Sequence, residues 1–163
     1  MLLQRQELDE MNAETVLTGI AKALAKCGLE AVLIGNAAAA LQGAPVTTLD
    51  FDFMFRKTPA NLAKLKRLAE ELGGQILRPY YPASSLYRLM VDDRGWQLDF
   101  MSVVHGVTSF ASLRSGATKV FFGQHPLLVA DLRDVIRSKK AAGRARDRAV
   151  LEILEKTLRE KEK

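Results

Sequence analysis

Hydrophobic residues recur in this chain with two periods, and each period predicts a different kind of element. Where apolar residues return every three to four positions, an amphipathic helix is expected. Four segments have this pattern. The first is 12–27, with Leu17, Ile20, Leu24 and Cys27 on one face, and the second is 59–72, which starts at the Thr58-Pro59 cap and stops at Gly73. The third is 131–140, capped by Asp131, and the last helix has an apolar stripe of Val150, Ile153, Leu154 and Leu158. The charged residues 159–163 are expected to fray.

Short apolar or alternating segments predict the strands. They are residues 31–34, 47–55, 75–77, 86–91, 96–104, 118–122 and 127–130. The turn signal at 92–95 joins two of these strands into a hairpin, whereas Pro79 and Pro82 favour a loop or a sheet edge over 79–82. Residues 107–115 have only a weak helical or loop pattern.

Length and composition favour one globular domain of 163 residues, with 48% hydrophobic and 26% charged residues. We expect an N-terminal helix at 12–27, a core over 30–130 and a helical C-terminal part over 131–160. The net charge of +5 favours polyanionic partners, although a solvated basic surface explains it equally well. Cys27 has no second cysteine with which to form a disulfide and is expected in the core. No apolar run has the length of a signal peptide or a membrane span, so we expect a cytoplasmic protein with no membrane partner.

The candidate chemistry begins with two acids in the predicted strand 47–55. Asp50 and Asp52 alternate with apolar residues, so both acids lie on one face of the strand, roughly 7 Å apart. Two carboxylates at this spacing can reach one hard cation or a close pair of cations, and a cation relieves their mutual repulsion. A solvated strand face would also carry polar residues, but aspartate is depleted in strands.

The residues ahead of these acids complete a recognisable signature. The apolar strand 31–34 ends at Gly35-Asn36, and an alanine-rich helix follows over 37–41. This order, continued by Thr-Leu-Asp-Phe-Asp-Phe, resembles the signature of the nucleotidyltransferase (DNA polymerase β-like) superfamily, especially small bacterial nucleotidyltransferases that include abortive-infection and type IV toxin–antitoxin toxins. Asn36 stands where that family has Gly or Ser, but asparagine tolerates the left-handed backbone and offers an amide donor. The resemblance implies an α+β nucleotidyltransferase fold, in which a mixed β-sheet is flanked by helices and followed by C-terminal helices.

A third acid, Asp99, lies alone between two apolar residues of the predicted strand 96–104. In the superfamily a third carboxylate comes from a later strand beside the Asp-x-Asp strand, and Asp99 matches that position. The resemblance implies that Asp50, Asp52 and Asp99 are catalytic and bind Mg²⁺ or Mn²⁺. Asp99 would either complete a second-metal site or act as base toward the acceptor. The alternative is a lone aspartate at a sheet edge or on the surface.

The basic segment near the C-terminus also resembles the family. Lys139, Arg144 and Asp147 match the family's Lys…Ala-x-Arg-x-Lys-Asp segment, with Arg146 in place of its second lysine. Lys139 extends the apolar stripe of its predicted helix, where a lysine needs water or a partner for its ammonium group. The resemblance implies that Lys139 and Arg144 contact the triphosphate, together with Gly35 and Asn36. A solvated basic turn between two helices is the alternative.

Two functions remain open at this point. The first is an Mg²⁺-dependent nucleotidyltransferase that binds an NTP such as ATP and transfers NMP to a hydroxyl of tRNA, protein or a small molecule. Such an enzyme could be the toxin that pairs with an antitoxin. The second is an inactive protein with this fold that binds nucleotide or RNA or serves as an interaction module. Zinc, serine-hydrolase and Walker-type chemistry have no support, since His105 and His125 lack partners at metal-ligand spacing and no elbow or P-loop motif occurs.

Overall fold

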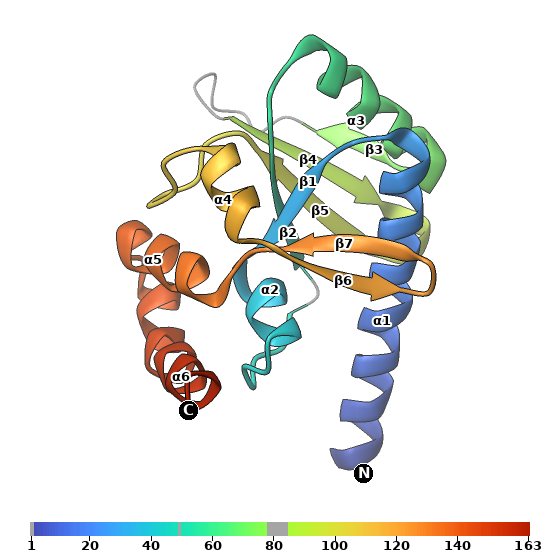
Figure 1. Ribbon diagram of the computed structural model, residues 1–163. Coiled ribbons are helices and arrows are strands. Elements are labelled where there is room, and N and C mark those ends of the chain that lie inside the picture. The colour runs from blue at the N-terminus through green and yellow to red at the C-terminus, as the bar shows by residue number, and fades with distance from the viewer. Residues whose placement is uncertain (1, 49, 78–84) are drawn as a thin grey trace.

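The computed structural model describes residues 2–48, 50–77 and 85–163 (Figure 1). Its helices are α1 (Leu2–Cys27), α2 (Gly35–Leu41), α3 (Pro59–Leu72), α4 (Phe110–Gly116), α5 (Leu132–Ala142) and α6 (Ala145–Lys161). Its strands are β1 (Ala31–Ile34), β2 (Asp50–Phe55), β3 (Gln75–Leu77), β4 (Leu86–Val91), β5 (Trp96–Met101), β6 (Thr118–Phe122) and β7 (His125–Val129). These strands form one sheet in the order β3-β4-β5-β2-β1-β7-β6. The predicted α+β architecture with helices around a mixed sheet is confirmed.

Strand β2 lies in the middle of this sheet, between β5 and β1. It pairs parallel to β5 and antiparallel to β1, and β1 pairs parallel to β7. The hairpins β4–β5 and β6–β7 are antiparallel. Because β2 has a hydrogen-bonded neighbour on each side, the positions of its side chains are fixed by both neighbours.

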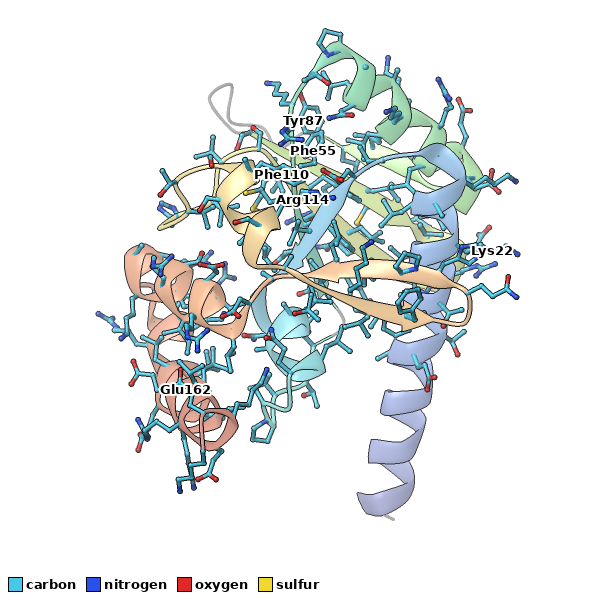
Figure 2. All side chains as sticks on the ribbon, in the orientation of Figure 1. Lys22, Phe55, Tyr87, Phe110, Arg114 and Glu162 are labelled. Atoms are coloured by element: carbon cyan, nitrogen blue, oxygen red, sulfur yellow. The ribbon has the colours of Figure 1, made fainter. Side chains whose placement is uncertain are left out.

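One face of β2 anchors the sheet in the core. Phe51, Phe53 and Phe55 are buried, and the rings of Phe53 and Phe100 stack with centroids 5.0 Å apart. Phe55 also meets the ring of Tyr87 edge to face at 6.1 Å (Figure 2). Burial of each phenylalanine contributes about 2 kcal/mol relative to exposure. This apolar face holds the other face of β2, which carries the acids, in a defined orientation.

The helices cover the sheet in two groups (Figure 1). Helix α1 contacts α3, β6 and β7, whereas α2 contacts β1, β2 and α5, and α5 contacts α6. Through the contacts of α2 with α5 and of α5 with α6, the basic C-terminal segment lies near β1 and β2. None of the helices in the described ranges is long and apolar enough to cross a membrane.

The largest differences from the predicted bounds concern α1, β2 and β5. Helix α1 begins at Leu2 rather than near residue 12, since residues 2–11 contain strong helix formers and no glycine or proline. Strand β2 begins at Asp50 rather than 47, and the hydroxyl of Thr48 accepts from the backbone N–H of Asp50 at 3.1 Å. Strand β5 ends at Met101 rather than 104, where its antiparallel partner β4 begins.

Smaller differences occur in the C-terminal half. The weak segment 107–115 contains helix α4, capped by the Ser109 hydroxyl, which accepts from the Ser112 backbone N–H at 3.0 Å. Strand β7 already begins at His125, since the β6–β7 hairpin closes there. The prediction for Ile153 was wrong: it is 39% exposed, and Leu151 packs toward the core instead. Helix α6 continues to Lys161, further than predicted, and the loop predicted at 79–82 lies outside the described residues.

Candidate functional site

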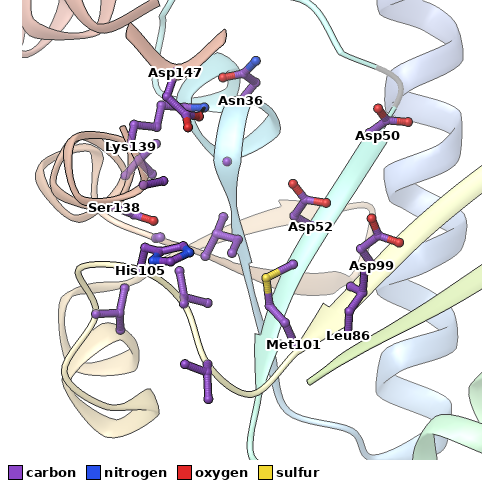
Figure 3. A pocket seen from close by; sticks show the side chains of 18 of the residues that line it. Asn36, Asp50, Asp52, Leu86, Asp99, Met101, His105, Ser138, Lys139 and Asp147 are labelled. Carbon is purple, nitrogen blue, oxygen red and sulfur yellow. Dashed lines mark ion pairs between the residues drawn. The ribbon is translucent and has the colours of Figure 1, made fainter. Parts of the chain in front are cut away.

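The three predicted acids lie on one face of the central strands. Asp52 of β2 and Asp99 of β5 are direct partners in the parallel register, and Asp50 is opposite Gln97. Register partners project from the same face of a sheet, so the three carboxylates lie on one face (Figure 3). Asp50 is exposed, Asp52 is half-buried and Asp99 is buried. The structure thus brings Asp99 next to the Asp-x-Asp strand.

Gly35 lies beside Asp52 at the junction of β1 and α2, and Asn36 follows it in α2. Gly35 has a φ of +70°, and a Cβ atom built on it would lie 3.2 Å from Oδ2 of Asp52. A side chain at position 35 would therefore meet the acid. The Oδ1 atom of Asn36 is buried and has no hydrogen-bond partner among the described residues. Buried side-chain oxygens usually have a hydrogen-bond partner, so this amide oxygen is an unusual feature of the described residues.

The basic segment surrounds a buried carboxylate. Arg144 donates from Nε to Oδ2 of Asp147 at 2.6 Å, and its backbone N–H donates to the same oxygen at 3.2 Å, which caps α6. Nζ of Lys139 lies 3.6 Å from Oδ1 of Asp147, and both side chains are largely buried. Burial opposes ionisation of Asp147, but hydrogen bonds and charges from Arg144 and then Lys139 outweigh it and lower the pKa of Asp147. Burial also lowers the pKa of Lys139, although Asp147 partly opposes this effect.

Asp52 lies at the electrostatic centre of these groups. Burial, followed by the charges of Asp99 and Asp50, raises the pKa of Asp52 to about 6. Lys139 and Arg146 oppose that rise from the facing helices. Ionised Asp52 is therefore short of positive charge, and a bound cation would stabilise its charged form.

These residues line one cavity of about 630 Å³ (Figure 3). The acids form one wall, and Lys139 with Asp147 lies on the other. Arg144 and Arg146 also line the cavity, so every residue predicted for the site borders it. Sequence reasoning did not assign the further lining residues Arg88, Gln97, Met101, His105, Asp134 and Ser138 to the site.

Arg88 is the most informative of the residues that were missed. It lies opposite Asp99 in the β4–β5 hairpin, and its Nε and Nη2 atoms donate to Oδ1 and Oδ2 of Asp99 at 2.9 and 3.2 Å. A signal for it was present in the sequence, because counting back from the 92–95 turn places Arg88 opposite Asp99.

The comparisons with known proteins concern the whole fold. The sequence matches no protein-family model and no curated protein. Among solved structures, the antibiotic-resistance factor ANT(2″)-Ia has a TM-score of 0.63 and 16% identity, over 92% of this chain and 85% of that one. The predicted nucleotidyltransferase TM1012 from Thermotoga maritima has a TM-score of 0.60 and 21% identity, over 90% of this chain and 92% of that one. The lincosamide antibiotic adenylyltransferase LnuA has a TM-score of 0.57 and 11% identity, over 81% of this chain and 89% of that one. This chain has a nucleotidyltransferase fold. The fold implied by the sequence resemblance is thereby confirmed.

Some of the acids at this site are suited to bind a divalent cation. Asp50 and Asp52 offer hard oxygen ligands, and the raised pKa of Asp52 indicates uncompensated negative charge. Within the described ranges, however, no three carboxylate, histidine or cysteine side chains are grouped closely enough to hold a metal ion. Asp99 already has a guanidinium partner. The ligand roles predicted for Asp50, Asp52 and Asp99 therefore remain predictions.

Replacement of Gly35 by alanine tests the contact between this glycine and Asp52. The left-handed backbone should make Gly35→Ala less stable by about 1–2 kcal/mol in urea unfolding, and the new Cβ should also displace the Asp52 carboxylate. Gly28→Ala is the matched control, because Gly28 has a φ of +68° and no atom within 4 Å of the added Cβ. Both variants should lose similar stability, but only Gly35→Ala should weaken Mg²⁺–ATP binding, measured by calorimetry. Equal binding by the two variants would contradict the assigned contact.

Proposed function

We propose that this chain is a Mg²⁺- or Mn²⁺-dependent nucleotidyltransferase that moves NMP from an NTP, such as ATP, to a hydroxyl group. The observation that carries the proposal is a single cavity with Asp50, Asp52 and Asp99 on one wall and the cations Lys139 and Arg146 facing them. Carboxylates that hold a metal, set opposite basic groups that neutralise phosphate, are the protein parts that phosphoryl and nucleotidyl transfer requires.

Each group has a proposed role in the transfer. The acceptor oxygen forms a bond to the α-phosphorus while the bond to the β-phosphate oxygen breaks, and pyrophosphate leaves with the electron pair. Asp50 and Asp52 would hold the divalent cation, which supplies positive charge to the triphosphate oxygens. Asp99 would complete the metal site or accept the proton of the acceptor hydroxyl at its carboxylate.

The phosphates would be bound from the helical side of the cavity. Lys139 and Arg146 supply positive charge there, and Arg144 has guanidinium donors left besides those that bind Asp147. Gly35 lets the backbone approach the ligand, and Asn36 brings an amide whose Oδ1 is unpartnered among the described residues. Asp147 holds Lys139 at this wall rather than contacting the nucleotide.

The acceptor is proposed by class. LnuA is described with bound lincomycin, and ANT(2″)-Ia has been described in complex with adenylyl-2″-tobramycin. A small molecule with a hydroxyl group is therefore an acceptor class that this fold serves, and here the cavity has an apolar wall at Met101, Val104 and Leu113 for its body. A tRNA or protein acceptor, and a toxin role with an antitoxin partner, remain predictions.

The test is calorimetric titration of the four NTPs into the protein, with and without Mg²⁺. Mg²⁺-dependent binding is expected for the parent and should weaken at least about tenfold in an Asp50→Ala/Asp52→Ala variant, since two charged ligands are lost. Asp92→Ala/Asp93→Ala is the control, because it removes two exposed acids from the distant β4–β5 turn. It should bind like the parent.

The alternative function is a nucleotide- or RNA-binding module without catalysis. The observation in its favour is that Asp99 is already neutralised by Arg88, which leaves two free acids rather than three. Nucleotide binding that is independent of Mg²⁺ and unaffected by loss of Asp50 and Asp52 would favour this alternative. If the folded parent bound none of the NTPs, both the nucleotidyltransferase and the nucleotide-binding function would be contradicted.

A further inference from the structure

A row of charged side chains crosses the sheet at the level of Asp52. Asp52 is paired in register with Asp99, and Asp99 is paired in register with Arg88 on the other side. All three side chains project from the same face, and each belongs to a different strand. Asp99 thus lies between a carboxylate and a guanidinium, both at fixed positions of the sheet.

Both carboxylate oxygens of Asp99 accept hydrogen bonds. Oδ1 accepts from Nε of Arg88 at 2.9 Å, and Oδ2 accepts from Nη2 of Arg88 at 3.2 Å and from Nε2 of Gln97 at 3.4 Å. The Asp99 side chain is only 11% exposed, whereas that of Arg88 is 41% exposed. A bidentate guanidinium–carboxylate pair of this kind is stronger and more directional than a single ion pair.

The same carboxylate cannot serve the guanidinium and a divalent cation equally. The Asp99 carboxylate already accepts three hydrogen bonds on about four lone-pair sites, and a metal ion bound there would lie close to the positive charge of Arg88. Asp50 and Asp52 have no such competitor, because no hydrogen bond or ion pair to their carboxylates is found among the described residues. We therefore expect Asp50 and Asp52 to bind a cation more readily than Asp99.

We propose that Arg88 is an internal counter-ion that competes with a divalent cation for Asp99. The folded site then binds one cation at Asp50 and Asp52, and a second cation binds only when Arg88 releases Asp99. This inference rests on the proposed function, because it concerns the metal content of the same site. Arg88 acts as a positioning residue that holds the Asp99 carboxylate and sets the number of bound metal ions.

The experiment counts bound Mn²⁺ by electron paramagnetic resonance, with and without the non-hydrolysable nucleotide α,β-methylene-ATP. Arg88→Met removes the competing charge and retains an unbranched side chain. Arg88→Gln keeps one donor for Asp99 and serves as the second variant if loss of the pair impairs folding. Arg94→Met is the matched control, since it makes the same substitution at the far turn of the same hairpin, where Arg94 lies over the ring of Trp96. Folding of each variant is checked by circular dichroism.

We expect Arg88→Met to bind one more Mn²⁺ than the parent, or to bind its weakest Mn²⁺ at least about tenfold more tightly, since a like charge next to the ligand is removed. Arg88→Gln should show a smaller gain, and Arg94→Met none. Addition of Asp99→Asn to Arg88→Met should abolish the gain, which would locate the extra ion at Asp99.

Two results would overturn the inference. The first is equal Mn²⁺ number and affinity in the parent, Arg88→Met and Arg88→Gln while the parent binds Mn²⁺ and nucleotide, which would leave the proposed function intact. The second is no Mn²⁺ binding by any folded variant, which would overturn the proposed function as well. Binding by the Arg88 variants without binding by the parent would contradict the cation placed at Asp50 and Asp52, and it would support Arg88 as the competitor for Asp99.

Discussion

An Asp52→Asn variant is expected to be more stable than the parent at pH 8 in the absence of metal, by about 2–3 kcal/mol. The pKa of Asp52 is raised to about 6 in the folded protein by burial and by the charges of Asp99 and Asp50. In the unfolded chain the group has its ordinary pKa near 3.8. A raised folded pKa means that Asp52 favours folding only while it is protonated, and this contribution is lost as the pH rises through about 6. Asparagine keeps the shape of the side chain and removes the charge.

The pH dependence identifies the cause of this stabilisation. Urea unfolding should show little advantage of Asp52→Asn at pH 4 and the full advantage at pH 8, where the acid is ionised in both states of the parent. Mg²⁺ with ATP should stabilise the variant less than the parent, because one proposed ligand is missing. Asp92→Asn, at an exposed turn position, should stay within about 0.5 kcal/mol of the parent. A variant less stable than the parent at pH 8 would show that Asp52 is already well compensated without metal.

This instability is informative about function. Asp52 is expected to lower the stability of the cation-free fold, and it lies among acids opposite basic groups. Functional sites commonly concentrate like charges in this way, and a ligand then restores the balance. The same carboxylate of Asp52 is therefore central to the stability prediction and to the proposed metal site.

The sequence predicted the elements that depend on local patterns. Thr58 caps α3, as expected, and accepts from the Asn61 backbone N–H at 3.1 Å. Asp131 caps α5 in the same way, and Cys27 is buried. The alternation in β2 correctly separated an apolar face from an acidic one, because side chains of a strand alternate between its faces.

Contacts between different elements were harder to predict. The pairing of Arg88 with Asp99 depends on the register of the β4–β5 hairpin, and a shift by one residue would have separated them. The approach of Lys139 and Arg146 to Asp52 depends on the packing of α2 against α5, which no local pattern encodes. The resemblance to nucleotidyltransferases gave the order of the site motifs along the chain. The structure added Arg88 as the counter-ion of Asp99 and Asp147 as the partner of Lys139.

Loss of Asp147 is expected to have the largest effect on stability in the C-terminal helices. Asp147→Ala should lower the free energy of unfolding by about 3 kcal/mol at pH 7, because it leaves the buried Lys139 ammonium without its partner and removes the cap of α6. The side chain of Asp147 is 2% exposed and that of Lys139 is 11% exposed, so water compensates only in part for the lost contact. The pKa of Asp147 is lowered despite burial, so its contribution is present at neutral pH and is lost as the pH falls below about 4, opposite to that of Asp52.

A double-variant cycle separates the ion pair from the helix cap. Lys139→Met combined with Asp147→Ala should recover part of the lost stability in urea unfolding, since no unpaired charge then remains buried. The control is Glu155→Ala, which removes a carboxylate of the same helix that pairs with Lys140 at 2.7 Å but is 36% exposed, and it should change stability by less than about 1 kcal/mol. Equal losses in Asp147→Ala and Glu155→Ala would contradict the special role of the buried acid. With the cycle as expected, Asp147 is the residue that keeps a charged lysine inside the wall of the cavity, where a triphosphate can meet it.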